Sequence, residues 1–362
     1  MIGLTLGRYF LVRYLKMTAY LLLGVFTLSL ILDFTELSSR TSMLPQYTVL
    51  GALTLSAMRV PFILQQTVPF IALFGAMSTL ISLNRKYELV VARSAGISAW
   101  QFLTPILFGA LLFGVAAVLV LNPLAAWGYS TAESVEGSWQ AGHKTNVQRD
   151  RIPWIKQVTD AGETIIGAKT FDQRGTRLID ATFVRFDANH DIKERIDADT
   201  AVLKDGYWLL SGATRYVRGE QPEKLGETRI KTLLKPEFVE EKLARAESIP
   251  FFELRRKIAA ARSFGHSAND FAMQYNWLLA MPALLMAMVL IAATVSLKFT
   301  RFGQSGAMIL GGIAAGFVLY VVSVVVQAFG RAGFVPTFVA AWFPVLIAVF
   351  FGVSFLLHRE DG

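Results

Sequence analysis

Residues 60–83 read VPFILQQTVPFIALFGAMSTLISL and include no charged side chain. The hydrocarbon core of a bilayer requires about 20 consecutive apolar residues per helical span, whereas apolar runs of about 10–14 residues are more typical of buried core helices. This stretch therefore predicts a transmembrane helix. The composition agrees, because 54% of the 362 residues are hydrophobic and only 17% are charged, against about 25% charged residues in soluble domains.

Similar apolar stretches lie on both sides of this one. We expect six spans, at about residues 14–37, 60–83, 97–122, 271–297, 306–329 and 334–357. The third should end at Asn122-Pro123, because proline cannot continue the hydrogen-bond ladder of a helix. The first is expected to be a retained span, because no small-residue cleavage site follows its apolar run.

Residues 138–245 have a different pattern, with dense charges and alternating hydrophobicity. Alternate positions from Ile192 to Val202 form one side of a period-two pattern, as a half-buried strand requires. Asp205-Gly206 predicts a tight hairpin turn. We expect strands at about residues 152–158, 163–171, 178–186, 192–202, 207–217 and 228–234. This arrangement predicts an antiparallel sandwich or an open jelly roll.

The sequence thus predicts an α-helical membrane protein with six transmembrane helices, three before and three after an inserted antiparallel β-jellyroll domain. The expected divisions are residues 1–130, residues 131–265 and residues 266–362. The middle part ends in a basic amphipathic helix at residues 250–263, predicted to lie at the membrane surface.

Loop charge predicts the orientation, because short cytoplasmic loops collect Lys and Arg. With both termini cytoplasmic, the β domain lies outside. The inner segments then hold Arg8, Arg13, Lys16, Arg85, Lys86, Arg93, Lys298, Arg301 and Arg359, and the short outer loops hold mainly Arg40, Arg59 and Arg331.

Several function classes find no support in the sequence. The net charge of +8 comes without a nucleic-acid-binding motif, and the chain has no cysteine. There is no phosphate-binding loop and no G-x-S-x-G motif. The four histidines do not have metal-ligand spacing: His143, His190, His266 and His358. We therefore expect no catalytic residue, no metal site and no cofactor bound by this chain. Because spans two to six contain no carboxylate between their ends, a proton-driven carrier is also disfavoured.

The segment RKYELVVARSAG, residues 85–96, lies between two spans on the predicted cytoplasmic side. It suits a short amphipathic helix ended by Gly96 in the left-handed conformation. A permease would dock onto an ATPase at such a position, with Glu88 available to pair with a basic groove of the partner. The alternative is an ordinary interfacial loop in which Glu88 pairs with Arg85 or Lys86.

Residues 88–96 resemble the coupling helix of the LptF/LptG family of lipopolysaccharide-export permeases. The family is also matched in kind and position by Arg8-Tyr9, the segment RFG at 301–303, the glycine-rich fifth span and AAWFP at 340–344. The tail from His358 to Gly362 resembles LptG more than LptF.

The resemblance implies a bacterial inner-membrane permease with a periplasmic β domain. Its implied partners are an LptF-like permease, a dimer of an LptB-like ATPase that carries ATP and magnesium, and an LptC-like membrane-anchored jellyroll protein. Lipopolysaccharide would enter from the outer leaflet and pass along the jellyroll domains. The alternatives are an LptF-type subunit, or a membrane scaffold that recruits β-sandwich proteins without transport. An intramembrane enzyme acting on lipids is disfavoured, because no nucleophile, base and acid are clustered.

The resemblance also implies roles for particular residues. The coupling helix would use Arg85, Glu88, Val91, Ala92 and Arg93. Near the outer end of the first span, Asp33 stands where the family often has a lysine that meets lipid A phosphates, so Arg40 or Arg59 would take that role. These charges could instead only mark the membrane interface.

Two further sets of residues have both a functional and an ordinary interpretation. Gly312 and Gly316 form a GxxxG pair, which serves close helix packing or a sliding gate. Phe317, Tyr320 and Val324 share a helix face that would meet acyl chains or pack in the bundle. In the β domain, inward positions such as Ile196 and Trp208 would shelter acyl chains in a conduit or form a plain core.

Overall fold

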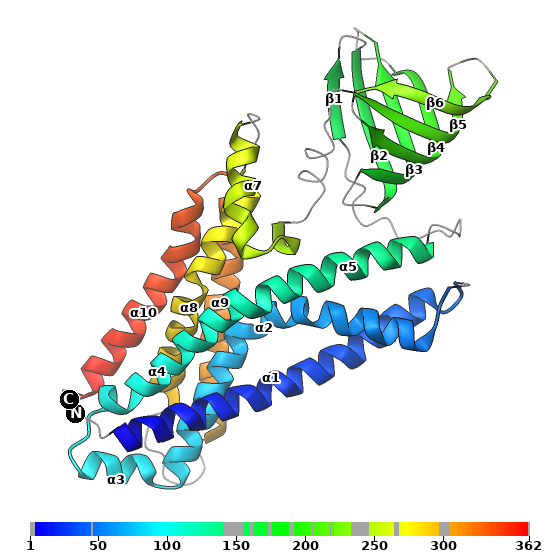
Figure 1. Cartoon of the computed structure of the whole chain (residues 1–362). Coiled ribbons are helices and arrows are strands. Elements are labelled where there is room, and N and C mark those ends of the chain that lie inside the picture. The colour runs from blue at the N-terminus through cyan, green and yellow to red at the C-terminus, as the bar shows by residue number, and fades with distance from the viewer. Residues whose placement is uncertain are drawn as a thin grey trace. The chain divides into compact units, whose positions relative to one another are not determined.

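The computed structural model describes residues 4–44, 46–140, 155–159, 162–172, 176–187, 192–204, 206–217, 219, 221–232, 246–263, 268–296 and 305–360. Lys298, the segment 301–303, His143, His190, His266 and the ends of the first and last predicted strands lie outside these residues. Within them, six helices are long and apolar enough to cross a membrane (Figure 1). The prediction of six spans is therefore confirmed.

The first two spans are α1 (Leu4–Thr41) and α2 (Val49–Arg85), and the last three are α8 (Asn269–Ser296), α9 (Ser305–Arg331) and α10 (Thr337–Glu360). The third consists of α4 (Ala99–Ala116), a π-helical turn (Ala117–Leu121) and α5 (Asn122–Gln140). A short helix, α3 (Glu88–Ser94), lies between α2 and α4, and α7 (Phe251–Ser263) precedes α8. Arg40, Arg59 and Arg331 lie inside α1, α2 and α9, so their predicted places in outer loops are wrong.

The third span continues through Asn122-Pro123, so the prediction that it ends there is wrong. Proline lacks an N–H group and its ring crowds the preceding turn of an α-helix. Here a π-helical turn comes directly before Asn122 and Pro123. We attribute the continuity to this wider turn, which changes the local hydrogen-bond pattern without ending the helix.

Asn122 connects this turn to two other helices. Its fully buried side chain donates from Nδ2 to Gln65 Oε1 of α2 at 3.2 Å. Its Oδ1 accepts a hydrogen bond from the backbone N–H of Phe251, the first residue of α7, at 2.8 Å. One side chain thus satisfies a free N–H group at the start of α7 and holds three helices together.

The chain divides into two compact units. One contains Met1–Glu36, Ser56–Gly128 and Ile249–Gly362, and the other contains Leu37–Leu55 and Tyr129–Ser248. Helix α7, which the prediction grouped with the β domain, therefore belongs to the unit that holds most of the helical bundle. Close helix contacts in this unit use small residues. A Cβ added at Gly114 of α4 would lie 2.5 Å from the Cα atom of Pro282 in α8.

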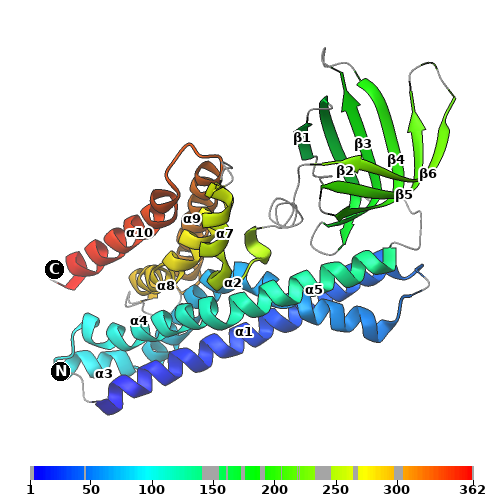
Figure 2. The same cartoon turned by 45° about the horizontal axis from the view of Figure 1, so that its top comes forward.

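The inserted domain is antiparallel, as predicted. Its strands pair in sequence order as one curved sheet (Figure 2). They are β1 (Ile155–Thr159), β2 (Gly162–Asp172), β3 (Arg177–Phe186), β4 (Ile192–Lys204), β5 (Tyr207–Tyr216) and β6 (Glu223–Lys231). Gly206 between β4 and β5 has a φ angle of +82°, as the predicted hairpin turn requires.

In strand β4, the buried positions change from even-numbered to odd-numbered residues after Ala198. In β4, Ile196 and Ala198 are buried, and beyond them Ala201 and Leu203 are buried. The strict alternation predicted through Val202 is therefore wrong.

The shift coincides with unusual backbone conformations in the neighbouring strands. Asp180 of β3 and Gly212 of β5 have φ angles of +50° and +68°, and the strand register places both beside Asp199 of β4. A Cβ at Gly212 would lie 2.2 Å from Asp199 Oδ2. Asp180, Asp199 and Gly212 are neighbours across β3, β4 and β5, so the three strands change their alternation together. Residues before and after these positions therefore face the same core.

Glu194 at the start of β4 joins three strands. Its buried carboxylate accepts from Arg185 Nη1 of β3 at 2.5 Å and from Arg215 Nε of β5 at 2.6 Å. Burial alone would raise the pKa of Glu194, but the hydrogen bonds and charges of the two arginines outweigh this effect and lower it. The ionised carboxylate therefore stabilises this end of the sheet.

We predict that Glu194→Gln destabilises β3–β5 by about 2 kcal/mol at pH 7, because two guanidinium groups lose hydrogen bonds to a charged acceptor. The lowered pKa means that this contribution is present above the ordinary value of 4.5 and is lost as the pH falls through the folded value. Hydrogen exchange of β3–β5 in the full chain, compared between variants at pH 7 and pH ~3, measures this. Glu227→Gln, an exposed change in β6, is the control. An equal difference at both pH values would contradict the assignment.

Candidate functional site

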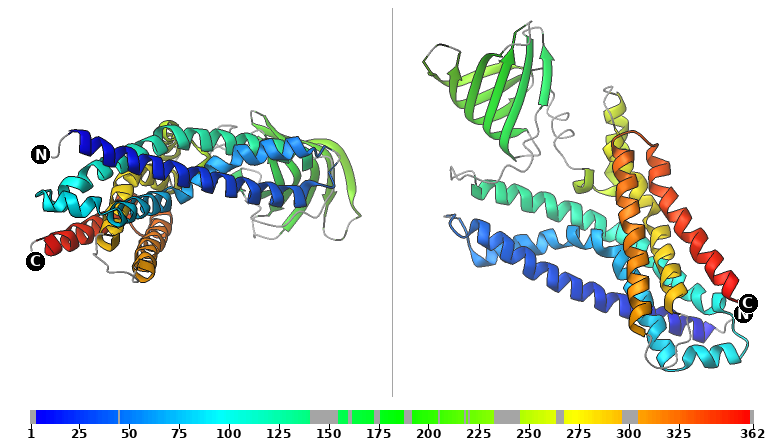
Figure 3. Two further views of the ribbon diagram at one scale, coloured as in Figure 1. Left: turned by 90° about the horizontal axis from the view of Figure 1, so that it is seen from below. Right: turned by 180° about the vertical axis from the view of Figure 1, so that it is seen from behind.

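Helix α3 lies at the same end of the bundle as both chain termini (Figure 3). Its start is marked by Tyr87, which has a φ angle of +58°. Its end has Gly96 at +81°, with hydrogen bonds from Gly96 N–H to Arg93 O at 2.9 Å and from Ile97 N–H to Ala92 O at 3.1 Å. This pattern is a Schellman motif, and the predicted role of Gly96 as terminator is confirmed.

The two sides of α3 have different environments. Leu89 and Ala92 point inward, and Ala92 is only 7% exposed. Val91 and Arg93 point outward, and Val91 is 65% exposed. Arg85, the last residue of α2, is also exposed. Of the residues predicted to contact a partner, Arg85, Val91 and Arg93 are accessible, whereas Ala92 packs α3 against its own chain.

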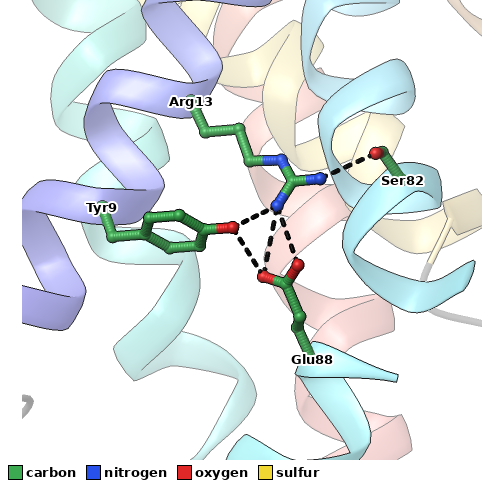
Figure 4. A network of polar contacts seen from close by, with 4 residues as sticks. All are labelled: Tyr9, Arg13, Ser82 and Glu88. Carbon is green, nitrogen blue, oxygen red and sulfur yellow. Dashed lines mark hydrogen bonds and ion pairs between the residues drawn. The ribbon is translucent and has the colours of Figure 1, made fainter. Parts of the chain in front are cut away.

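Glu88 is held by the first span (Figure 4). Arg13 of α1 donates from Nη1 to both oxygens of Glu88, at 2.9 Å to Oε1 and 3.2 Å to Oε2. The hydroxyl of Tyr9 donates to Glu88 Oε2 at 2.9 Å and accepts from Arg13 Nη1. The other guanidinium nitrogen, Nη2, donates to Ser82 Oγ of α2 at 2.9 Å. This network connects α1, α2 and α3.

Tyr9 and Arg13 were not among the residues predicted for this site. Arg85 or Lys86 was the predicted intramolecular partner of Glu88, and the structure shows Arg13 instead. One signal was available, because Tyr9 and Arg13 are four residues apart and therefore share a helix face. The guanidinium carbon of Arg13 lies 5.6 Å from the centre of the Tyr9 ring.

The predicted head-group residues include an ion pair. Asp33 Oδ1 of α1 lies 3.9 Å from Arg59 Nε of α2, and the Asp33 side chain is only 10% exposed. Its Oδ2 atom is buried and has no hydrogen-bond partner among the described residues. The negative charge of Asp33 is thus offset by Arg59. Arg40 lies exposed in the last turn of α1.

The two glycines of the predicted GxxxG pair lie where α9 meets α2. A Cβ at Gly312 would lie 2.9 Å from Met77 Cε, and a Cβ at Gly316 would lie 2.3 Å from Leu73 Cδ2. Hydrogen atoms at these positions therefore permit the close approach that the packing interpretation requires.

The residues predicted to meet acyl chains divide between two environments. Phe317 and Val324 of α9 are exposed, whereas the Tyr320 ring packs against Phe70 of α2 with centroids 4.9 Å apart. In the β domain, Ile196 and Trp208 are buried in the core, as their inward positions predicted. The Trp208 ring makes an edge contact with Phe183 at 6.0 Å.

These observations define a six-span membrane protein with an inserted antiparallel β domain and a short helix, tied to the first span, at one end of its bundle. The profile of the family described as lipopolysaccharide export system permease LptF/LptG matches residues 8–359, and the chain belongs to this family.

The chain is also similar to lipopolysaccharide export system permease protein LptG of Haemophilus influenzae (strain ATCC 51907 / DSM 11121 / KW20 / Rd). The two are 24% identical over 365 residues, which cover 98% of this chain and 99% of the relative. Together with its apolar helices, this places the chain among the multi-pass inner-membrane permease subunits of lipopolysaccharide export.

We predict that Gly316→Leu destabilises the bundle by about 1–3 kcal/mol, because the larger side chain overpacks the contact with α2. The measurement is thermal unfolding of the purified chain in a bilayer nanodisc. Gly311→Leu is the matched control, since it lies on the exposed side of α9 with nothing within 4 Å of its Cβ position. Equal stability of the two variants would show that the α9–α2 contact does not depend on the small residue.

Proposed function

We propose that this chain is the LptG-type permease subunit of an ABC transporter. The transporter would extract lipopolysaccharide from the inner membrane and pass it to a periplasmic β-jellyroll bridge toward the outer membrane. The similarity to a protein named LptG supports the subunit type over LptF. The basic residues around α3 and before the first span support cytoplasmic termini and a periplasmic β domain.

The proposed partners are an LptF-like permease, an LptB-like ATPase dimer and an LptC-like membrane-anchored jellyroll protein. ATP and magnesium would be bound by the ATPase, and this chain would supply the membrane path. The apolar surface of α1 supports pairing within the membrane. In its most apolar window, only 6% of the residues are buried inside this chain, which leaves a long helix face for a second permease or for lipid.

The Glu88 network is the observation that carries the proposal. The outward side of α3 offers Arg85, Val91 and Arg93 to a partner, while Glu88 connects the same helix to Arg13 of α1. A displacement of α3 by an ATPase would therefore be transmitted to α1 through the Arg13–Glu88 ion pair and its charge-assisted hydrogen bonds. In this proposal, Glu88 is the connection between the docking surface and the first span.

The remaining candidate residues would form the substrate path. Phe317 and Val324 on the exposed side of α9 would meet acyl chains, and the Gly312–Gly316 contact would let α9 slide against α2 as part of a gate. Arg40 would meet head-group phosphates. The core around Ile196 and Trp208 would continue the path, because each methylene sheltered from water contributes about 0.8 kcal/mol.

The test uses complexes formed by co-expressing this chain with LptB-like and LptF-like proteins, reconstituted in proteoliposomes that contain lipopolysaccharide. We expect ATP-driven release of lipopolysaccharide to a jellyroll acceptor. In Glu88→Ala, hydrolysis persists while release falls by about tenfold or more, because hydrogen bonds to a charged group contribute about 1.5–3 kcal/mol each. The exposed change Glu227→Ala in β6 is the control.

The charge exchange Arg13→Glu with Glu88→Arg identifies the partner of Glu88. Partial recovery of release relative to the single variants supports the intramolecular pair. If Arg13→Ala releases lipopolysaccharide like wild type and the charge exchange does not restore release, Glu88 acts on the ATPase alone. If no ATPase co-purifies with the wild-type chain, the permease proposal fails and a membrane scaffold becomes the better hypothesis.

A further inference from the structure

Helix α7 is fixed on the helical bundle through its apolar side. Leu254 and Ala261 are buried, and α7 packs against α8. The Phe251 ring stacks on Tyr275 of α8, with centroids 5.3 Å apart and an interplanar angle of 6°. The backbone N–H of Phe251 donates to Asn122 at 2.8 Å. The apolar side of α7, which an interfacial helix would insert into lipid, is therefore occupied by protein.

The opposite side of α7 is basic. The exposed residues Phe252, Arg255, Arg256 and Arg262 lie within an arc of about 120° at the helical spacing of 3.6 residues per turn. Phe252 is 64% exposed. Glu253 and Lys257 lie outside this arc, so the face carries three guanidinium groups and no carboxylate. We call these four residues the arginine face.

The arginine face lies away from the proposed ATPase-docking helix. Helices α7 and α3 are at opposite ends of the bundle, and both belong to the same compact unit (Figures 1 and 3). In the proposed orientation, α7 is on the periplasmic side, directly after the β domain in the chain. It is thus close in sequence to the β domain, the proposed exit of the substrate.

We propose that the arginine face binds phosphate groups on the head group of the transported glycolipid. This inference rests on the proposed function. Guanidinium groups bind phosphate through paired, charge-assisted hydrogen bonds, and Phe252 supplies an apolar contact beside them. A discrete substrate fits this face better than the bulk leaflet, because the apolar side of α7 is not available for insertion.

The ion pair of the first span gives a second reason. Asp33 and Arg59 offset each other at 3.9 Å, so this pair adds no net positive charge for an anionic head group. The three arginines of α7 supply that charge from a helix whose position is fixed by Asn122 and Tyr275. The arginine face is therefore the better phosphate-binding surface within the bundle unit.

The experiment places a photoreactive phenylalanine analogue at Phe252 in the complex with its partner subunits. The complex is held in phosphatidylcholine nanodiscs that contain either lipopolysaccharide or an equal charge of phosphatidylglycerol. We expect a lipopolysaccharide adduct whose yield falls about tenfold or more in the triple variant Arg255→Gln, Arg256→Gln, Arg262→Gln, since each basic residue near a charged lipid contributes about 1 kcal/mol. Lys257→Gln, which removes a charge outside the face, should leave the yield unchanged.

Each other outcome has a defined meaning. Equal adducts with phosphatidylglycerol would overturn the inference in favour of contact with the bulk leaflet. A triple variant that crosslinks lipopolysaccharide like wild type would overturn it by showing that the three arginines do not contribute to binding. Absence of any lipid adduct in a complex that still releases lipopolysaccharide would overturn it while leaving the proposed function in place. A specific adduct without ATP-driven release would support the arginine face and count against the transport function.

Discussion

The hydrocarbon core of a bilayer offers no water to backbone N–H and C=O groups, and this constraint explains the form of most of the chain. Each span must remain a continuous helix wherever it meets lipid, even where the sequence contains proline. The third span meets this requirement with a π-helical turn before Asn122 and Pro123. Asn122, directly after this turn, also holds helices together, because its side chain forms hydrogen bonds with Gln65 and with the start of α7.

The same solvent changes how the helices hold together. Lipid is as apolar as leucine, so association depends on close packing and on polar contacts between helices. Gly114 against Pro282 and Gly316 against Leu73 provide the close packing, and Asn122 with Gln65 provides the polar contact. Among the described residues, exposed apolar side chains cover much of α1 and the outer side of α9. Surfaces of that kind suit a subunit whose membrane path is completed by another protein.

The sequence was sufficient for features that depend on local patterns. Charge-free stretches located the spans, alternation located the strands, and Gly96 was predicted as the terminator of α3. It was insufficient where distant segments decide the outcome. The shift of alternation after Ala198 coincides with positive φ angles at Asp180 and Gly212 in the neighbouring strands. The partner of Glu88 is Arg13, 75 residues away. Arg85 and Lys86 lie much closer to Glu88 in the sequence, so the sequence alone could not identify Arg13 as the partner.

The geometry of Glu88 changes what its charge can do. An ionised carboxylate has about four sites for accepting hydrogen bonds, and Arg13 and Tyr9 occupy three of them. Glu88 is therefore poorly suited to be a free acid captured by a basic groove. It is better suited to hold α3 against α1 while Val91 and Arg93 remain exposed. Because partly exposed pairs contribute modestly to stability, the network can join the two helices without fixing them rigidly. Coupling free energies between sites are typically about 1–3 kcal/mol, a range that this ion pair with its accompanying hydrogen bonds can supply.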